Sequence, residues 1–450
     1  MTQSSTAIAH GRRGGRCNTG RDKMCGVAQA MPSHAGTRTT WRMTRLAPES
    51  LDPRGNLSMT ERYSPEPSKA DHRELLKTGS AIIAAIGLAM LAGCATRPSP
   101  DVLKPVHLSQ PTHAEKTPVS VKVLVATNRT PDSIRGGFGS AWADNLTYEQ
   151  YAFSVPPGRK DTAITYPTSR PDPERQFAVI RRKQLAKDAF VEEALRSTQS
   201  DGTVGIFVHG YNYSYQEALF RTAQIAADAN IPGSPVLFSW PSAAAVAGYV
   251  ADRDAALSSR SDLDSLVAAL SASGKVKRII LFGHSMGGFL VMETVRQLKL
   301  QHRDEVIGKL AVILAAPDID VDVFRSQLKD IGRMPIPISL LVSKDDRALV
   351  ASSFIAGERA RVGRLDIDDP VIREAALKER LRVIDITSIQ ASDGLGHDRY
   401  ASLAKFGAQL ASFESGRRST AGDVGAYVFD AAGAAVASPF RLAGRVVGSQ

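Results

Sequence analysis

The stretch that decides the fold is Arg278-Ile-Ile-Leu-Phe282, followed at once by Gly283-His284-Ser285-Met286-Gly287-Gly288. The first five residues are typical of a buried strand, and the apolar pattern of residues 288–299 is typical of a helix. A serine in the pattern G-x-S-x-G between a strand and a helix lies on a sharp turn that exposes its hydroxyl group. We therefore expect Ser285 to be a nucleophile; the alternative is a Gly/Ser-rich turn without chemistry.

The same alternation of strands and helices runs through residues 119–415. Strands are expected at residues 121–127, 151–155, 177–181, 204–208, 235–239, 278–282, 310–314, 338–342 and 381–386, and helices at 216–229, 255–270 and 288–299. The strands at 151–155 and 177–181 are expected to form an antiparallel N-terminal part. Continuous apolar strands between helices favour a parallel sheet covered on both faces, so we predict an α/β fold: a three-layer α/β/α sandwich with a mostly parallel sheet.

A base for the serine can be found by elimination, since a serine hydroxyl is weakly nucleophilic alone. Five of the histidines after residue 94 lie before the candidate acids or belong to other motifs: His107, His113, His209, His284 and His302. His397 lies in a Gly-rich loop after the last predicted strand, which suits the chain order serine, acid, histidine. We expect His397 to be the general base.

The acid of the site has four candidates. Asp345 and Asp346 follow the strand at residues 338–342, whereas Asp318 and Asp320 follow the strand at 310–314. We favour Asp346, because the loop after the later strand is the commoner place for this acid. Any one of the four could instead cap a helix, and Asp320 and Asp345 suit that role well.

An oxyanion hole is expected from two backbone N–H groups. The strand at residues 204–208 ends in His209-Gly210-Tyr211-Asn212, where such a turn offers the amide of Tyr211; the residue after the nucleophile, Met286, offers the other. The imidazole of His209 is expected to have a structural role. No His, Cys, Asp and Glu residues show metal-ligand spacing, so the sequence implies no metal and no other cofactor.

The N-terminal part carries an export pattern. Arg73 and Lys77 precede an apolar run, residues 81–92, which is too short to span a bilayer because that needs ~20 residues. The run has the features of a secretory signal and ends in Leu91-Ala92-Gly93-Cys94, which resembles a bacterial lipobox. That resemblance implies cleavage before Cys94 and its acylation; the alternative is a buried helix with an incidental cysteine.

These observations divide the chain into five segments. Residues 1–58 are a disordered extension or precede the true start, 59–93 are a lipoprotein signal peptide, 94–118 a flexible tether, 119–415 the folded domain, and 416–450 a flexible tail. Because Ala95 rather than an aspartate follows Cys94, we expect a lipid-anchored protein of the bacterial envelope, on the periplasmic side of the outer membrane.

The positive charge of the chain does not indicate a nucleic-acid partner. The formal net charge is +10, of which residues 1–58 contribute +6 through nine basic and three acidic residues. The remainder is nearly balanced and has no dense Lys/Arg stripe. We therefore expect no nucleic-acid partner, and a small-molecule or lipid acyl substrate instead.

The chain from about residue 121 to 413 resembles the bacterial α/β hydrolases of the domain-of-unknown-function 900 group. The resemblance is carried by Ala126-Thr127-Asn128-Arg129, the His209–Asn212 turn, Phe238-Ser239-Trp240-Pro241, Gly283–Gly287, Ala315-Ala316-Pro317-Asp318-Ile319-Asp320 and Asp346-Arg347-Ala348-Leu349. It implies the α/β-hydrolase fold and supports Asp346 as the acid, because Asp-x-Ala-Leu is the matching form.

The expected function is that of a serine hydrolase that cleaves a carboxylic ester or thioester through an acyl-enzyme. Two alternatives stay open at this point: a peptidase or amidase of the same fold, and a non-catalytic envelope-binding lipoprotein. The preference for an ester rests on what this fold most often does.

The lipobox generates a first prediction. In a Gram-negative host, radiolabelled palmitate should enter the wild-type protein at Cys94, and the residues before Cys94 should be lost. The variant Cys94→Ala should take up no label, because it lacks the thiol. Equal incorporation into both proteins would show that Cys94 is not acylated.

Overall fold

The computed structural model describes residues 97–108, 117–157, 159, 162–197, 202–229 and 233–403, with the backbone of 427–430. All of them lie in the compact unit Thr78–Gln450. The predicted extension, signal peptide and Cys94 fall outside the described residues, as does most of the predicted tail.

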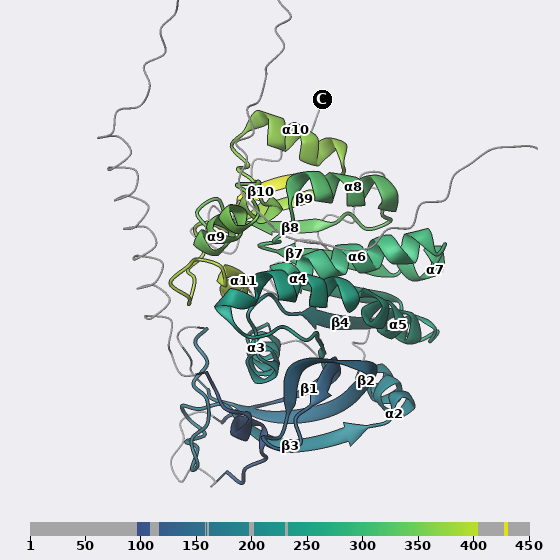
Figure 1. Cartoon of the computed structure of the whole chain (residues 1–450). Helices are drawn as coiled ribbons and strands as arrows, with labels where there is room; N and C mark the ends of the chain where they lie inside the picture. The colour runs from purple at the N-terminus through teal and green to yellow at the C-terminus, as the bar shows by residue number, and fades with distance from the viewer. Residues whose placement is uncertain are drawn as a thin grey trace, which may run out of the picture. The chain divides into compact units, whose positions relative to one another are not determined.

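A single mixed sheet organises the described part of the chain, with the strand order β10-β9-β8-β7-β6-β4-β5-β1-β2-β3. The strands are β1 (Val119–Pro131), β2 (Phe138–Val155), β3 (Ala178–Leu185), β4 (Thr203–Val208), β5 (Val236–Ser239), β6 (Arg278–His284), β7 (Leu310–Ala315), β8 (Ser339–Val342), β9 (Arg382–Asp385) and β10 (Tyr427–Asp430). Figure 1 shows β1, β2 and β3 at one end of the sheet and β8, β9 and β10 at the other.

The helices fill the connections between the strands. They are η1 (Pro100–Leu103), α2 (Lys187–Arg196), α3 (Tyr215–Asp228), η2 (Val246–Gly248), α4 (Tyr249–Ser258), α5 (Arg260–Ser271), α6 (Met286–Leu300), α7 (Asp304–Ile307), α8 (Val321–Ile331), α9 (Arg347–Ile355), η3 (Val362–Arg364), α10 (Pro370–Lys378) and α11 (Arg399–Leu403).

Apolar residues of the central strands face two separate cores, one on each side of the sheet. In β4, for example, Ile206 packs in the core with α4, α5, α6 and α8, while the next residue, Phe207, packs in the core with α3 and α11. Because successive side chains of a strand point to opposite faces, a strand covered on both sides must be apolar throughout. The predicted three-layer α/β/α sandwich is confirmed.

Strand direction brings the connecting loops together. β1 pairs in parallel with β5 and antiparallel with β2, and β2 pairs antiparallel with β3. From β5 across to β10 every pairing is parallel. The loops after β4, β5, β6, β7, β8 and β9 therefore leave the same edge of the sheet, which is where ligands bind in folds of this kind.

One helix differs from the sequence-based expectation. The single helix predicted at residues 255–270 is two helices, α4 and α5, which meet at Ser259. The Ser259 hydroxyl donates to the Ala255 carbonyl at 2.7 Å and accepts from the Asn128 amide at 2.9 Å, and such back-bonding of serine bends helices. In the predicted tail, Tyr427–Asp430 forms the brief strand β10 beside β9.

The segment that precedes β1 also differs from the expected tether over residues 94–118. Within it, η1 begins after Ser99, whose side chain accepts from the Asp101 N–H, and the side chains of Val102 and Leu103 are buried. Leu103 belongs to the core on the α3 side of the sheet. The Val106 N–H donates to the Val179 carbonyl of β3 at 2.9 Å. This part of the segment therefore packs on the domain.

The packing of Leu103 can be tested by its effect on stability. Leu103→Ala should lower the free energy of unfolding by about 2–3 kcal/mol, because it removes a buried side chain from a core that cannot fully collapse. The measurement is urea unfolding followed by circular dichroism, with Lys104→Ala, an exposed neighbour, as the control. If both variants unfold at the wild-type midpoint, the segment does not contribute to the core.

Candidate active site

The candidate nucleophile lies on a sharp turn between β6 and α6. Ser285 has φ 53° and ψ −122°, a conformation that non-glycine residues rarely adopt, and its side chain is buried. The backbone of the turn is held by neighbouring loops: the Ser285 N–H donates to the Ala315 carbonyl at 2.9 Å, and the Ser285 carbonyl accepts from the Asp318 N–H at 3.2 Å. The structure thus has the strand–turn–helix geometry that the sequence motif predicts.

The glycines of the motif are required by close backbone contact. A Cβ on Gly287 would overlap the carbonyl oxygens of Val208 and His209 at the end of β4. A Cβ on Gly283 would lie 2.8 Å from the Gly287 carbonyl oxygen. Only hydrogen at these positions allows β6, α6 and the end of β4 to approach this closely.

His397 and Asp346 are brought together from the loops after β9 and β8. The His397 Nδ1 atom lies 2.7 Å from Asp346 Oδ2, within hydrogen-bond distance. Asp346 is fully buried and is also the N-cap of α9, since its Oδ1 accepts from the Leu349 N–H at 3.0 Å. The His397 side chain is 14% exposed, so solvent can still reach the imidazole.

The environment of His397 sets its protonation. Burial acts to lower the pKa of its imidazole, but the charge and hydrogen bond of Asp346 raise it more, with further contributions from Asp393 and Asp318. The net effect raises the pKa of His397 above its ordinary value. Once neutral, an imidazole with a raised pKa is a stronger proton acceptor, which suits the task of a general base.

The loop that carries His397 is fixed at both ends. The His397 N–H donates to Asp393 Oδ1 at 2.9 Å, and the His284 Nε2 lies 3.3 Å from the His397 carbonyl oxygen. The rings of His284 and His397 are 4.7 Å apart, so the residue before the nucleophile contacts the proposed base directly. Among the described residues no hydrogen bond joins the Ser285 hydroxyl to His397 itself; such bonds often tighten only when substrate binds.

The turns that carry the two predicted oxyanion donors, Tyr211 and Met286, are in contact at Gly210. A Cβ on Gly210 would lie 2.9 Å from the Cβ of Ser285, so the turn after β4 is in contact with the turn after β6. Within the described part of the chain, the backbone N–H groups of Tyr211 and Met286 donate to no other residue. Unpaired amides are suited to stabilise negative charge, and that of Met286 also lies at the N-terminus of α6.

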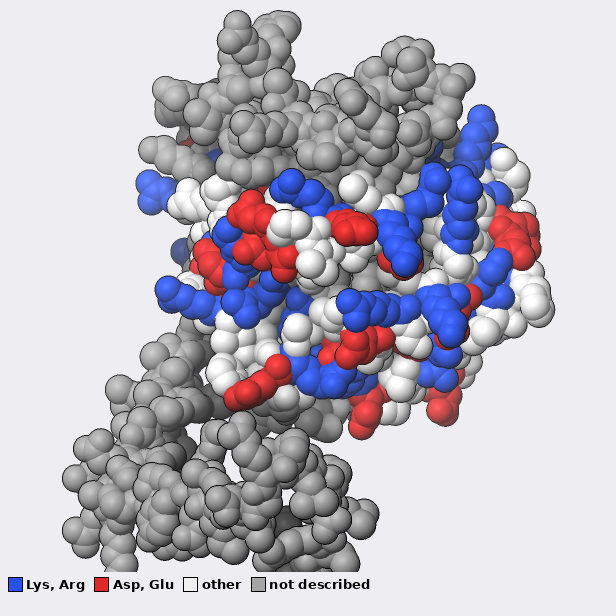
Figure 2. Space-filling model, turned by 90° about the horizontal axis from the view of Figure 1, so that it is seen from above, with Lys and Arg blue, Asp and Glu red and all other residues white. Residues whose placement is uncertain are grey.

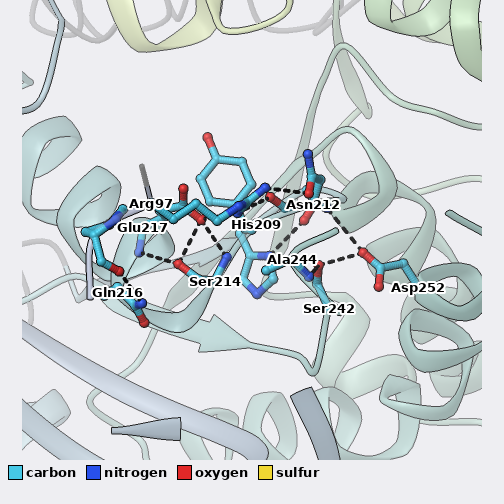
Figure 3. A network of polar contacts seen from close by, with 12 residues as sticks. Arg97, His209, Asn212, Ser214, Gln216, Glu217, Ser242, Ala244 and Asp252 are labelled. Atoms are coloured by element: carbon cyan, nitrogen blue, oxygen red, sulfur yellow. Dashed lines mark hydrogen bonds and ion pairs between the residues drawn. The ribbon is translucent and has the colours of Figure 1, made fainter. Parts of the chain in front are cut away.

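A network of polar contacts holds the turn after β4 (Figure 3). The Asn212 N–H donates to Asp252 of α4 at 3.2 Å, and Asp252 also accepts from the Ala243 N–H at 2.6 Å. From the other side, Arg97 donates to the Asn212 side-chain oxygen at 2.6 Å and to its carbonyl at 3.1 Å. The turn is therefore positioned by residues from distant parts of the sequence.

The imidazole of His209 points away from this chemistry, as expected for a structural residue. It is fully buried, its ring stacks on Trp240 at 4.9 Å, and its Nε2 lies 3.2 Å from the Trp240 carbonyl oxygen. Burial, with the charge of Arg129, lowers the pKa of His209 to about 3, which keeps it neutral. A neutral, enclosed ring contributes to the wall of the site rather than to proton transfer.

The other three candidate acids have different partners. Asp318 is buried and accepts from Tyr249 and Ser352 at 2.8 Å each, with Arg361 3.2 Å away. Asp320 caps α8 and pairs with Arg359, whose hydrogen bond lowers the pKa of Asp320 to about 2. Asp345 was expected to suit a helix cap, but that prediction is wrong: Asp346 is the cap, and Asp345 pairs with Arg399 at 2.8 Å.

Sequence reasoning assigned no role to three buried charged residues that support the site. Arg129 donates to the Ser239 hydroxyl at 3.1 Å and to the carbonyls of Ser242 and Tyr213, so it joins the loops after β4 and β5. Asp252 and Arg361 are also buried and bonded. Arg129 belongs to a signature of the resembling family, but the other two have no local motif that could have revealed them.

Other kinds of site find little support in the described residues. In this part of the chain no three His, Cys, Asp or Glu side chains are grouped so that they could hold a metal ion. No helix within it is long and apolar enough to cross a membrane. Seen from above, the described surface carries Lys/Arg and Asp/Glu side chains intermixed rather than in patches of one sign (Figure 2).

Comparison with known proteins yields one family. The family described as alpha/beta hydrolase of unknown function (DUF900) matches residues 183–413. No curated protein matches the chain.

Several solved structures are similar to the chain at low sequence identity. Esterase Est22 is 13% identical, over 66% of this chain and 82% of its own, with a TM-score of 0.32. An acetylxylan esterase is 12% identical, over 48% of this chain and 99% of its own, with a TM-score of 0.27. Est1E from Butyrivibrio proteoclasticus is 12% identical, over 60% of this chain and 94% of its own, with a TM-score of 0.30.

The pairing of His397 with Asp346 generates a prediction about rate and pH. Asp346→Asn should lower kcat/KM for an ester on the order of 10⁴-fold, because the histidine loses the partner that fixes its tautomer. Activity requires neutral His397 and so falls as pH drops through its pKa. Since Asp346 raises that pKa, the acid limb of the residual pH–kcat/KM profile should move to lower pH in the variant.

Asp345→Asn is the matched control, since it changes a neighbouring carboxylate that does not contact His397. Asp318→Asn and Asp320→Asn should also be milder than Asp346→Asn. An inactive Asp318→Asn variant beside a near-normal Asp346→Asn variant would identify Asp318 as the acid instead.

Proposed function

The chain belongs to the α/β hydrolases of unknown function (DUF900), and from this membership and the site geometry we propose that it is a serine hydrolase acting on a carboxylic ester or thioester. The proposed catalytic residues are Ser285, His397 and Asp346. The observation that carries the proposal is the 2.7 Å contact of His397 with buried Asp346 in a loop that packs against the strained turn of Ser285.

In the first step the Ser285 hydroxyl attacks the acyl carbonyl while His397 takes its proton. The raised pKa of His397 supports this role, because a more basic imidazole accepts the proton more readily. His397 then returns the proton to the leaving alcohol or thiol, and a serine ester remains. Water, activated by the same histidine, hydrolyses that ester and restores Ser285.

Asp346 would act on the histidine rather than on the substrate. Its Oδ2 faces Nδ1 of His397, which leaves Nε2 as the nitrogen available to the serine. The carboxylate also stabilises the imidazolium that forms in each step. Because its Oδ1 is bound to the first turn of α9, its position is fixed by the helix.

The amides of Tyr211 and Met286 would hold the negative oxygen of the tetrahedral intermediate. Loss of one such donor typically costs about 10²–10³ in rate, which shows how much depends on their placement. The contacts of Arg97 and Asp252 with Asn212 support this role, since they hold the turn in a preformed position.

We also propose that the protein is held in the bacterial envelope by a lipid anchor at Cys94. The support for this is the lipobox-like sequence alone, because Cys94 lies outside the described residues. An outer-membrane location on the periplasmic side follows from Ala95 in the next position.

Non-additivity of two mutations tests the mechanism. Ser285→Ala and His397→Ala should each remove nearly all triad-dependent turnover, and the double variant should be scarcely worse, because the base has nothing to deprotonate without the serine. The measurement is steady-state hydrolysis of a short-chain nitrophenyl ester by all four proteins, with circular dichroism as the control for folding.

Labelling with a fluorophosphonate probe gives an independent readout of the same residues. The probe should modify the wild-type protein at Ser285 and leave Ser285→Ala unlabelled. Multiplicative losses in the double variant, or a folded Ser285→Ala variant with full activity, would refute the proposed mechanism.

A further inference from the structure

Large apolar side chains are exposed on the segments that form the candidate active site. They are Val246, Val250, Phe354, Ile355 and Leu395, and together they are called the apolar rim below. Each is at least half exposed. A single exposed apolar residue is ordinary, but several around one site indicate a surface that meets another apolar phase.

Contacts of the described residues place the rim next to the proposed chemistry. The Val246 carbonyl accepts from the Tyr211 hydroxyl, and the Tyr211 ring packs edge-on against Tyr249, the neighbour of Val250. The Leu395 carbonyl accepts from the N–H of Arg347, the first residue of α9, at 3.0 Å. Two parts of the rim thus adjoin the proposed oxyanion turn and the proposed acid.

Hydrogen bonds connect the end of α9 to the proposed nucleophile. Ser352, two residues before Phe354, donates to Asp318 at 2.8 Å, and the Asp318 N–H donates to the Ser285 carbonyl at 3.2 Å. Figure 1 shows α9 and α11, which follow the loops of Asp346 and His397, on the same edge of the sheet. The rim therefore borders the site on more than one side.

The start of the described chain lies at the same place. Arg97 binds Asn212, the residue after Tyr211, and pairs with Glu217 at 2.6 Å, while the Pro98 carbonyl accepts from Gln216 at 2.7 Å (Figure 3). Cys94 is three residues before Arg97, and three extended residues span at most about 11 Å. A lipid attached to Cys94 would hold the membrane at the mouth of the site.

We propose that the apolar rim rests on the membrane that holds the protein, and that the substrate is a fatty acyl ester of a lipid in that membrane. The substrate assignment rests on the proposed function. An acyl chain could pass from the bilayer to Ser285 across an apolar border without entering water, where exposing each CH₂ group costs about 0.8 kcal/mol. A short tether would favour this orientation over all others.

The reaction balances as a hydrolysis. Ser285 Oγ forms a bond with the acyl carbon, the ester C–O bond breaks, and His397 delivers the proton to the departing lipid alcohol. Water then adds to the acyl-enzyme, which releases a fatty acid and regenerates the serine hydroxyl.

Orientation can be tested without reference to catalysis. The full chain, with Cys17 and Cys25 changed to serine, is produced in a Gram-negative host and reconstituted in vesicles of phosphatidylethanolamine and phosphatidylglycerol. An environment-sensitive dye is attached to Ile355→Cys or to Leu300→Cys. The two sites are matched in exposure, at 58% and 57%, but Leu300 ends α6, about 22 Å from Ser285 at its start.

Emission of the dye at position 355 should shift to shorter wavelength in vesicles compared with detergent-free solution, and emission at position 300 should not. A shift at neither position, or an equal shift at both, would overturn the proposed orientation. This result does not depend on whether Ser285 is a nucleophile.

The substrate class is tested by the ratio of two rates, hydrolysis of vesicle phospholipid and hydrolysis of a soluble nitrophenyl ester. The double variant Phe354→Ser/Ile355→Ser should lower this ratio about tenfold or more, because two apolar groups no longer enter the membrane. Leu300→Ser should leave both rates near wild type. Circular dichroism confirms that each variant is folded.

The outcomes separate the two proposals. Turnover of the soluble ester without phospholipid hydrolysis, or an unchanged ratio in the double variant, would overturn the lipid substrate and leave the serine hydrolase intact. If Ser285→Ala keeps both activities, the proposed function itself is overturned. The dye measurement would still decide the orientation.

Discussion

The structure of the site depends on one steric constraint, the close approach of the turn after β6 to the end of β4. Gly287 lies against the carbonyl oxygens of Val208 and His209, where no side chain fits. This contact holds the start of α6 near the end of β4, and Ser285, on the turn between β6 and α6, has φ 53°. A non-glycine residue in such a conformation costs on the order of 1–3 kcal/mol, which the rest of the domain must offset. The hydrogen bonds of Ser285 with Ala315 and Asp318 help to do so.

The loops around this turn are joined by buried polar residues rather than by apolar contact alone. Arg129 links the loops after β4 and β5, Asp252 links the first of these to α4, and Arg361 approaches Asp318 at 3.2 Å. Burial lowers the pKa of Arg129 to about 10, so it is still charged at neutral pH. Removing one partner of a buried ion pair, such as Arg361 with Asp318, leaves an uncompensated buried charge, which is strongly destabilising. The network therefore ties the geometry of the site to the stability of the domain.

The parts of this arrangement that depend on residues close together in the chain could be predicted from the sequence. Strand periodicity predicted the central sheet, and the glycine spacing around Ser285 predicted the turn, because both depend on neighbours in the chain. Asp252 and Arg361 were missed because each contacts a site loop that is distant in the sequence, through Asn212 and Asp318 respectively. At the break between α4 and α5, the Ser259 hydroxyl also accepts a hydrogen bond from Asn128, which is distant in the sequence. Likewise, a Pro/Ser/Thr-rich composition did not reveal that Leu103 finds a place in the core.

The hydrogen bonds of the four candidate carboxylates support Asp346 as the proposed acid. Both oxygens of Asp318 are occupied, by Tyr249 and Ser352. In Asp320, Oδ1 accepts from α8 and Arg359, and Oδ2 accepts from Arg359. Asp345 is paired with Ser343 and Arg399. Asp346 uses only Oδ1 for its helix, so Oδ2 is left to face His397. A fully buried carboxylate oxygen without a hydrogen-bond donor would destabilise the fold, and the imidazole N–H of His397 supplies that donor. The same contact that satisfies Asp346 orients His397, so helix capping and the proposed catalysis depend on one side chain.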